Sequence, residues 1–491
     1  MDGTPAEGTP AERTPAEGTP PEGTRRGLSA GQEAMWFVHR MAPGSAAYNI
    51  TLAFRVRTSA SAPLDVPVLR RAVAELAARH EVLHSTFAEG EQGPVRVVGP
   101  PDLVGLEVRE VPDAGDARLH DLVRRAGAEP FRLTAQAPLR VVLLRRAPDD
   151  AVLAVVAHHI VSDRTSQWLI MRDLLDAYRG LAGSGGPAWR PLAASFDDHV
   201  AAERRMLASP RRAELEARWA RLCAGVPAAE LPADRPRPAR QTFGGATHRV
   251  TFPAGLDRRL RERAEQAGVT PFVQLLGIFE ALLHRYGGQP EFVLGCPVAT
   301  RFGGAMRDVV GYLVNTVALR AAFPPGTTFA QAVASARRQL RDALGAARYP
   351  FPLVPKALDL PRAEDRPPVF QIAVTMVAAG NREPLLDLLA DDASAELEYG
   401  GLRLSIVDVA HMEGQLDLNV ELRQSPNSLT AVLRYNTDLF ESTTIERLGE
   451  HFVLLSRAAA EDPGARIGAV PLMTEDELRG LLRLGQGATA P

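Results

Sequence analysis

Residues 151–163, AVLAVVAHHIVSD, join an apolar run of strand-forming residues to two histidines and an aspartate. A second apolar run covers 139–145, and a polar turn at 148–150 separates the two, which predicts a β-hairpin. After the aspartate, apolar residues recur at helical spacing from 168 to 178. The unit is therefore strand, polar turn and helix, with the histidines at the end of the second strand.

Similar patterns alternate along the rest of the chain. Helices are expected at 66–80, 210–224, 271–286, 328–347 and 443–461. Strands are expected near 48–57, 246–252, 291–297, 315–321, 369–377, 402–408, 415–423 and 429–435. A glycine-rich stretch at 182–187 is typical of a linker. We therefore expect an α/β fold of two lobes, 27–183 and 184–491, with a cleft between them.

A five-residue unit, Thr-Pro-Ala-Glu-Gly with small variations, repeats through residues 4–23. It is rich in proline and acid and has no large apolar side chains, so burial cannot offset its ordering entropy. Residues 1–26 are accordingly predicted to be a disordered tail.

The bulk composition excludes several classes of protein. Of 491 residues, 45% are hydrophobic and 23% charged, and the net charge is −3, which argues against a basic nucleic-acid binder. The chain has no run of about 18 apolar residues and no pattern typical of a signal peptide, so we expect a cytoplasmic protein without a membrane partner. Its two cysteines, Cys223 and Cys296, lack disulfide or zinc spacing.

The cluster formed by His158, His159 and Asp163 is typical of residues that act in general acid–base catalysis. An imidazole with a pKa near ~6.5 is suited to removing a proton from an attacking amine or hydroxyl. Neighbouring side chains on a strand point to opposite faces, so one ring should face the cleft and the other the lobe interior. A purely structural pair, with Asp163 as a helix N-cap, also fits these residues. A metal site is disfavoured because the adjacent histidines diverge and no third ligand stands at metal spacing.

The run 158–163 resembles the His-His-x-x-x-Asp-Gly signature of the condensation domains of non-ribosomal peptide synthetases. Further segments resemble other motifs of that family in order: LSAGQEAMWF (28–37), RHEVLHSTF (79–87), SFDDH (195–199), VGYLVNT (310–316), YPFP (349–352), RPPVFQ (366–371) and YNTDLF (435–440). The resemblance covers roughly residues 28 to 485. Arg164 departs from it by replacing the signature glycine, and Ala34 by replacing an arginine.

This resemblance implies two chloramphenicol-acetyltransferase-like lobes in a V-shaped pseudo-dimer around a central tunnel. It makes His159 the catalytic residue, with His158 and Asp163 holding it in place. Arg301 is the first choice of ion-pair partner for Asp163 and Arg79 the second. Asn315 and Ser162 are candidates for the tunnel or its acceptor side, and Arg164 is expected to narrow the tunnel, pair with Asp163 or point into solvent.

The function implied is amide or ester formation between a carrier-bound acyl or aminoacyl thioester and an amine or alcohol. Peptidyl or acyl carrier proteins would bring substrates on 4′-phosphopantetheine arms, with a small-molecule acceptor as the alternative on one side, and no cofactor would bind the enzyme itself. We expect a free-standing monomer that works in trans, and the first two motifs favour an L-aminoacyl donor. A catalytically silent platform that recruits partner proteins is the alternative. The 310–316 motif disfavours an epimerisation domain, and the histidine pair disfavours a cyclising one.

Overall fold

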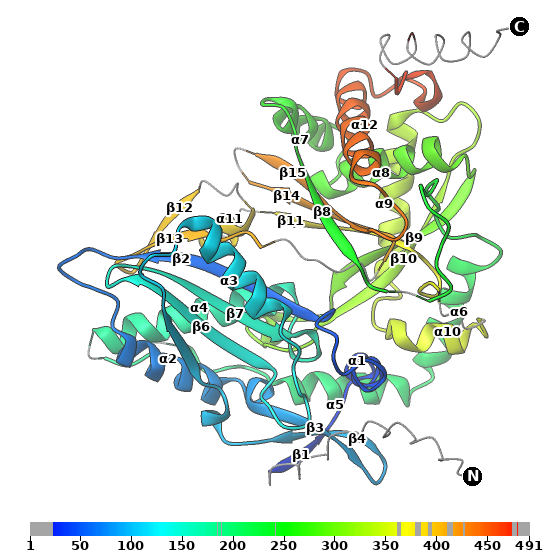
Figure 1. The fold of residues 1–491 in the computed structure, drawn as a ribbon. Helices are drawn as coiled ribbons and strands as arrows, with labels where there is room; N and C mark the ends of the chain where they lie inside the picture. The colour runs from blue at the N-terminus through cyan, green and yellow to red at the C-terminus, as the bar shows by residue number, and fades with distance from the viewer. Residues whose placement is uncertain are drawn as a thin grey trace, which may run out of the picture.

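The computed structural model describes residues 23–473 except 184, 188, 241, 361–364, 379–383, 391–394, 410–415 and 426–427, and also residue 479. Two α/β lobes, each built around a six-stranded sheet, make up the molecule (Figure 1). The predicted two-lobe α/β fold is therefore confirmed.

The first sheet has the strand order β12-β13-β2-β7-β6-β5. Its strands are β2 (Asn49–Arg57), β5 (Leu106–Glu110), β6 (Leu139–Ala147), β7 (Asp150–His158), β12 (Glu396–Tyr399) and β13 (Leu402–Ile406). The predicted hairpin is β6 and β7, which are antiparallel with Val141 opposite Val155. β2 also runs antiparallel to β7, and its Asn49 is opposite His158. The histidine pair therefore stands at the end of a central strand.

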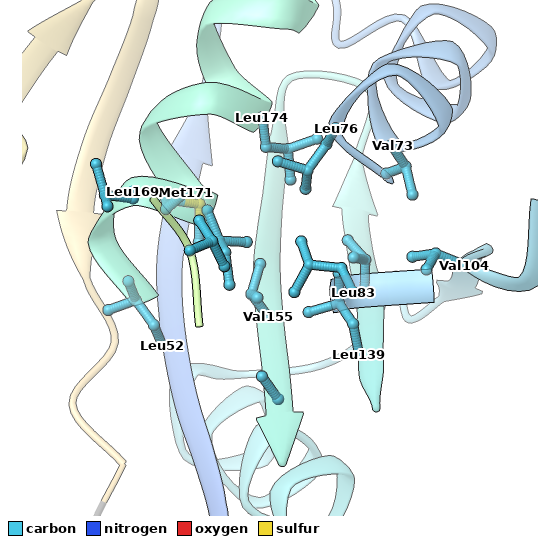
Figure 2. Close-up of a cluster of buried hydrophobic side chains, with 14 of the residues drawn as sticks. Leu52, Val73, Leu76, Leu83, Val104, Leu139, Val155, Leu169, Met171 and Leu174 are labelled. Atoms are coloured by element: carbon cyan, nitrogen blue, oxygen red, sulfur yellow. The ribbon is translucent and has the colours of Figure 1, made fainter. Parts of the chain in front are cut away.

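Helices cover both faces of this sheet. α2 (Val66–Arg79) and α4 (Arg164–Ala182) pack against one face, where Leu76, Val155 and Leu174 belong to one buried cluster (Figure 2). α3 (Asp116–Ala128) covers the other face. Because both faces are buried, β7 is apolar at nearly every position rather than alternating.

A smaller sheet and α1 (Ala30–Met41) complete this lobe. The small sheet has the order β1-β4-β3, with strands β1 (Thr24–Gly27), β3 (Ser85–Gly90) and β4 (Gly93–Val98). A capping box opens α1, in which the Ser29 hydroxyl accepts from the Gln32 amide and the Gln32 side chain accepts from the Ser29 amide.

The second sheet has the strand order β10-β9-β11-β14-β15-β8. Its strands are β8 (Gly245–Thr251), β9 (Glu291–Ala299), β10 (Val314–Ala322), β11 (Ile372–Ala378), β14 (Leu418–Gln424) and β15 (Leu429–Asn436). One face carries α7 (Leu256–Gln266), α8 (Pro271–Gly287), α9 (Phe329–Leu344) and α12 (Ser442–Glu461) (Figure 1). α6 (Arg211–Cys223) packs beside β10 on the other face. The helix before it in the chain, α5 (Phe196–Leu207), contributes Phe196 to the core of the first lobe.

The chain does not pass once from one lobe to the other. β12 and β13 lie within the predicted second lobe, 184–491, yet β13 pairs with β2 and so extends the first sheet (Figure 1). The boundary at 183/184 stays a prediction. It does not separate two self-contained units, because strands from both sides of it form the first sheet. At the other end, Thr24–Gly27 forms β1, whereas the predicted tail extended to residue 26. Residues 1–22 lie outside the described residues.

Among the described residues, no single helix is both long and apolar enough to cross a bilayer. Within the part of the chain that the structure describes, α7 and α8 pass that test as a pair, and the chain bends by 104° between them. The described residues also hold no group of three His, Cys, Asp or Glu side chains placed to bind a metal ion.

Candidate active site

The two histidines have different surroundings. His158 ends β7 and is 3% exposed, and its ring contacts those of His39, Tyr48 and Phe131. The chain then makes a 3-10 turn, His159–Val161, and the His159 ring lies partly exposed against Tyr312, with ring centroids 5.1 Å apart.

Backbone groups fix the orientation of His159. The Ser162 carbonyl oxygen lies 2.7 Å from the His159 Nδ1. A carbonyl oxygen can only accept, so Nδ1 carries the proton and Nε2 carries the lone pair. The turn itself is held because the Gln32 side chain donates to the Ile160 carbonyl at 2.9 Å. The pKa of His159 is lowered, chiefly by burial, so the imidazole is neutral at physiological pH.

His158 supports the turn. Its Nδ1 accepts a hydrogen bond from the Ile160 amide at 3.1 Å. Burial lowers the pKa of His158 to about 3, with electrostatic interactions with the neighbouring His39 and His159 rings as smaller causes, so this ring stays neutral as well. Its acceptor role and its burial place it in the scaffold of the turn.

Asp163 connects this turn to the second half of the chain. Its carboxylate is 3% exposed and accepts two hydrogen bonds from Arg301, at 2.9 and 3.0 Å, and one from the Leu313 amide at 2.9 Å. It also caps α4 by accepting from the Ser166 amide at 2.7 Å. Asp163 is thus both an N-cap and half of a buried ion pair. Although desolvation opposes it, the net effect of Arg301 and these donors lowers the Asp163 pKa.

Arg79, the second candidate partner, pairs instead with Asp173 on α4 at 2.9 Å and lies over the Trp189 ring. Arg164 does not bind Asp163 either. It forms an ion pair with Glu421 of β14, while its side chain keeps 41% of its surface exposed. The residue that departs from the signature therefore contacts the second sheet.

The two tunnel candidates act in different ways, Asn315 through its side-chain amide and Ser162 through its backbone carbonyl. Asn315 donates to the Ala347 and Tyr349 carbonyls at 2.9 and 2.8 Å and accepts from the Phe351 amide at 2.9 Å. It therefore fixes the loop that follows α9. The Ser162 side chain is fully buried, and it is the Ser162 carbonyl that contacts His159.

A cavity of about 100 Å³ opens beside Tyr312 on the side of α1 and α5. Gly31 allows Tyr312 to approach α1, because a Cβ at Gly31 would lie 2.2 Å from the tyrosine Cε1. His199 and Glu203 of α5 also line this cavity. Burial lowers the pKa of His199 to about 4 and raises that of Glu203. These cavity residues were not predicted as site residues, although His199 and Tyr312 stand inside segments that carried the family resemblance.

Comparison with known proteins identifies the family. The Condensation domain family model matches residues 25–482. Phosphinothricin tripeptide synthetase from Streptomyces viridochromogenes is 34% identical over 461 residues, which are 92% of this chain and 41% of the synthetase, so the chain spans less than half of that relative. The X-domain in complex with OxyB from teicoplanin biosynthesis is 26% identical with a TM-score of 0.78, and the match covers 95% of this chain and 100% of that one. The first condensation domain of the calcium-dependent antibiotic synthetase shares the fold, with 23% identity, a TM-score of 0.75 and coverage of 92% and 99%. This chain therefore belongs to the condensation-domain family of non-ribosomal peptide synthesis, with its chloramphenicol-acetyltransferase-like fold.

Proposed function

We propose that this chain joins a carrier-bound acyl or aminoacyl thioester to an amine or alcohol, with His159 as the catalytic residue. The observation that carries this proposal is the hydrogen bond between His159 Nδ1 and the Ser162 carbonyl, because it leaves Nε2 as a proton acceptor. The lowered pKa of His159 supports the same role, since a neutral ring is already competent at pH 7.

The reaction would proceed by attack of the nucleophile on the thioester carbonyl. As the new C–N or C–O bond forms, the nucleophile's proton passes to Nε2 of His159. The C–S bond then breaks, and the departing sulfur takes the proton back from the imidazolium. His159 therefore returns to its starting state, and orientation of the nucleophile by Nε2 contributes before any proton moves.

The supporting residues hold this geometry. Asp163 and Arg301 fix the segment that begins α4, and Gln32 and His158 hold the turn from either side. The substrates would arrive on 4′-phosphopantetheine arms of carrier proteins, with a small-molecule acceptor as the alternative on one side. No cofactor of the enzyme itself takes part in these steps.

The test is product formation from loaded carrier proteins, followed by mass spectrometry. His159→Ala should abolish the product while thermal unfolding stays close to wild type. His120→Ala, which removes an exposed histidine from α3, is the matched control and should retain activity. Full activity in folded His159→Ala would refute the catalytic role.

The recruitment-platform alternative has one observation in its favour, because the similar X-domain occurs in a complex with OxyB. A platform would give no product with the wild-type chain, and its affinity for a partner protein would be unchanged by His159→Ala. Product that depends on His159 excludes the platform as the sole function.

A further inference from the structure

Two polar side chains of α5 line the cavity beside Tyr312. His199 and Glu203 are four residues apart on this helix, so they lie on the same face of it. Both line the cavity, and so does Met206, which follows one turn later. The volume of the cavity is about 100 Å³, whereas a cavity of about 150 Å³ accommodates a benzene molecule. The cavity beside Tyr312 therefore has room for about four heavy atoms.

Both side chains offer hydrogen-bond acceptors. The Glu203 Oε1 accepts from the Ala30 amide at 2.7 Å, which holds the carboxylate against the start of α1. The Glu203 Oε2 accepts no hydrogen bond from any residue that the structure describes. His199 is neutral at pH 7, because burial lowers its pKa to about 4, so one of its ring nitrogens carries a lone pair. A donor group in the cavity can therefore bind to two acceptors on one helix face.

The environment of Glu203 favours a positively charged neighbour. Glu203 is partly buried, and within the described ranges of the chain it forms no ion pair. Burial raises its pKa, and the nearby Glu33 carboxylate adds to this effect, whereas the Ala30 amide and Arg204 oppose it. Arg204 is exposed, and its guanidinium donates to the Leu28 carbonyl at 3.2 Å. A cation in the cavity would replace the hydration that the Glu203 carboxylate loses on burial.

The rest of the lining is largely apolar. It includes Met206, Met306 and Val314. A basic residue, Arg348, also lines the cavity, and its guanidinium lies 4.2 Å from the centroid of the Phe302 ring. Both of these residues are exposed, so they mark the side of the cavity that faces solvent. A short alkyl chain that ends in an ammonium group therefore suits the cavity, with its carbon atoms against the apolar wall.

Tyr312 lies between this cavity and His159. Its ring contacts the His159 ring and also lines the cavity. Two van der Waals contacts in series, each about 3.5–4.0 Å, separate the cavity from the imidazole by roughly 7–8 Å. An extended chain advances about 1.3 Å per bond, so about six bonds cover this distance.

We infer that this cavity binds an ammonium group of a substrate, about six bonds away from the atom that reacts at His159. The ammonium would donate to Glu203 and His199 while the reacting end of the same molecule stands at Nε2 of His159. Either the acceptor or the acyl group can carry such an amine, and the experiment distinguishes the two. This inference rests on the proposed function and names a chemical class for its substrate.

The experiment measures dissociation constants by isothermal titration calorimetry with the full chain at about pH 8, where an alkyl ammonium with a pKa near ~10.4 stays charged. The acceptor pair is 5-aminopentan-1-ol and pentane-1,5-diol. The acyl pair is 6-aminohexanoyl-pantetheine and hexanoyl-pantetheine. We expect the amine of one pair to bind at least about tenfold more tightly than its neutral partner. The pair that shows this preference identifies the substrate that occupies the cavity.

Glu203→Gln should reduce this preference to less than about twofold, and its amide oxygen can still accept from the Ala30 amide. His199→Leu removes the second acceptor and should weaken the preference at least about threefold. Glu33→Gln is the matched control, because it removes the same charge from an exposed residue outside the cavity lining. It should change the preference by less than about twofold.

Three results would overturn the inference. They are equal affinities within both pairs, a preference that survives in Glu203→Gln and His199→Leu, and tighter binding of 5-hydroxypentanoate than of 5-aminopentan-1-ol. The last result would show that Arg348 selects an anion instead. If product formation still depends on His159 in any of these cases, only the inference fails and the proposed function stands.

Discussion

Replacement of Asp163 by alanine tests how the site is held together. The carboxylate accepts four hydrogen bonds in the structure, two from Arg301, one from Ser166 and one from Leu313. Asp163→Ala would leave the Arg301 guanidinium, whose side chain is 8% exposed, without its counter-charge. Loss of one partner of a buried ion pair costs about 3–5 kcal/mol, whereas loss of the N-cap alone would cost about 1 kcal/mol. We therefore expect a decrease of about 3–5 kcal/mol in the free energy of unfolding at pH 7.

The assay is guanidinium denaturation followed by tryptophan fluorescence, with a second variant that removes both charges. Asp163→Ala combined with Arg301→Leu should recover part of the loss, because no uncompensated charge stays buried. Arg403→Ala breaks the exposed pair with Glu398 and should cost less than about 1 kcal/mol. The folded state lowers the Asp163 pKa, so its contribution is present above the unfolded value of about 3.9 and is lost as the pH falls through the folded value.

Two results would refute this reasoning. A cost below about 1 kcal/mol for Asp163→Ala would show that the ion pair is not needed to hold the start of α4. A double variant less stable than the single one would show that Arg301 stabilises the fold through its other contacts, with Ser166 and the Val309 carbonyl.

Three further predictions concern protons and packing. Because burial lowers the His159 pKa, the rate of product formation should stay level as the pH falls to about 6.5 and decline only below it. A rate that already declines as the pH falls towards 6.5 would contradict the lowered pKa of the catalytic ring. Burial raises the pKa of Glu280 to about 8, so its contribution to the free energy of unfolding should be full below about pH 4.3 and lost as the pH rises towards 8. Glu280→Gln should remove this pH dependence from the free energy of unfolding measured in denaturation curves. An unchanged pH dependence would exclude Glu280 as its source. Gly31→Ala should lower the rate of product formation at least about tenfold by displacing Tyr312. Gly44→Ala is the control and should leave the rate unchanged, because its Cβ would meet nothing within 4 Å. Equal rates in both variants would show that Tyr312 moves aside without effect.

Much of the local structure could be predicted because its determinants are local. The β6–β7 hairpin follows from two apolar runs around a polar turn, and the capping box from the spacing of Ser29 and Gln32. The same holds for α2, expected at 66–80 and found at Val66–Arg79. In each case neighbouring residues provide the hydrogen bonds or the apolar face that define the element.

Contacts between distant segments were harder to anticipate. Nothing in the composition of β13 specifies that it pairs with β2 instead of with its own lobe, because strand periodicity identifies a buried face but not a partner. Asn315, predicted as a candidate for the tunnel, lines the cavity beside Tyr312, but its hydrogen bonds to the Ala347 and Tyr349 carbonyls have no sequence signal. His199 was overlooked as a site residue because a single histidine on a helix has no distinguishing spacing.

The amino-acid sequence by itself determined the strand, turn and helix around His158, His159 and Asp163, since periodicity and capping act over a few residues. Only the tertiary structure decided which way those side chains face and what they bind. The proton of His159 is placed by the backbone of Ser162, and Arg164 finds its partner, Glu421, on the other sheet. The first contact depends on the geometry of the 3-10 turn, and the second on how the two lobes pack against each other. Separation along the chain does not predict which residues such packing brings together.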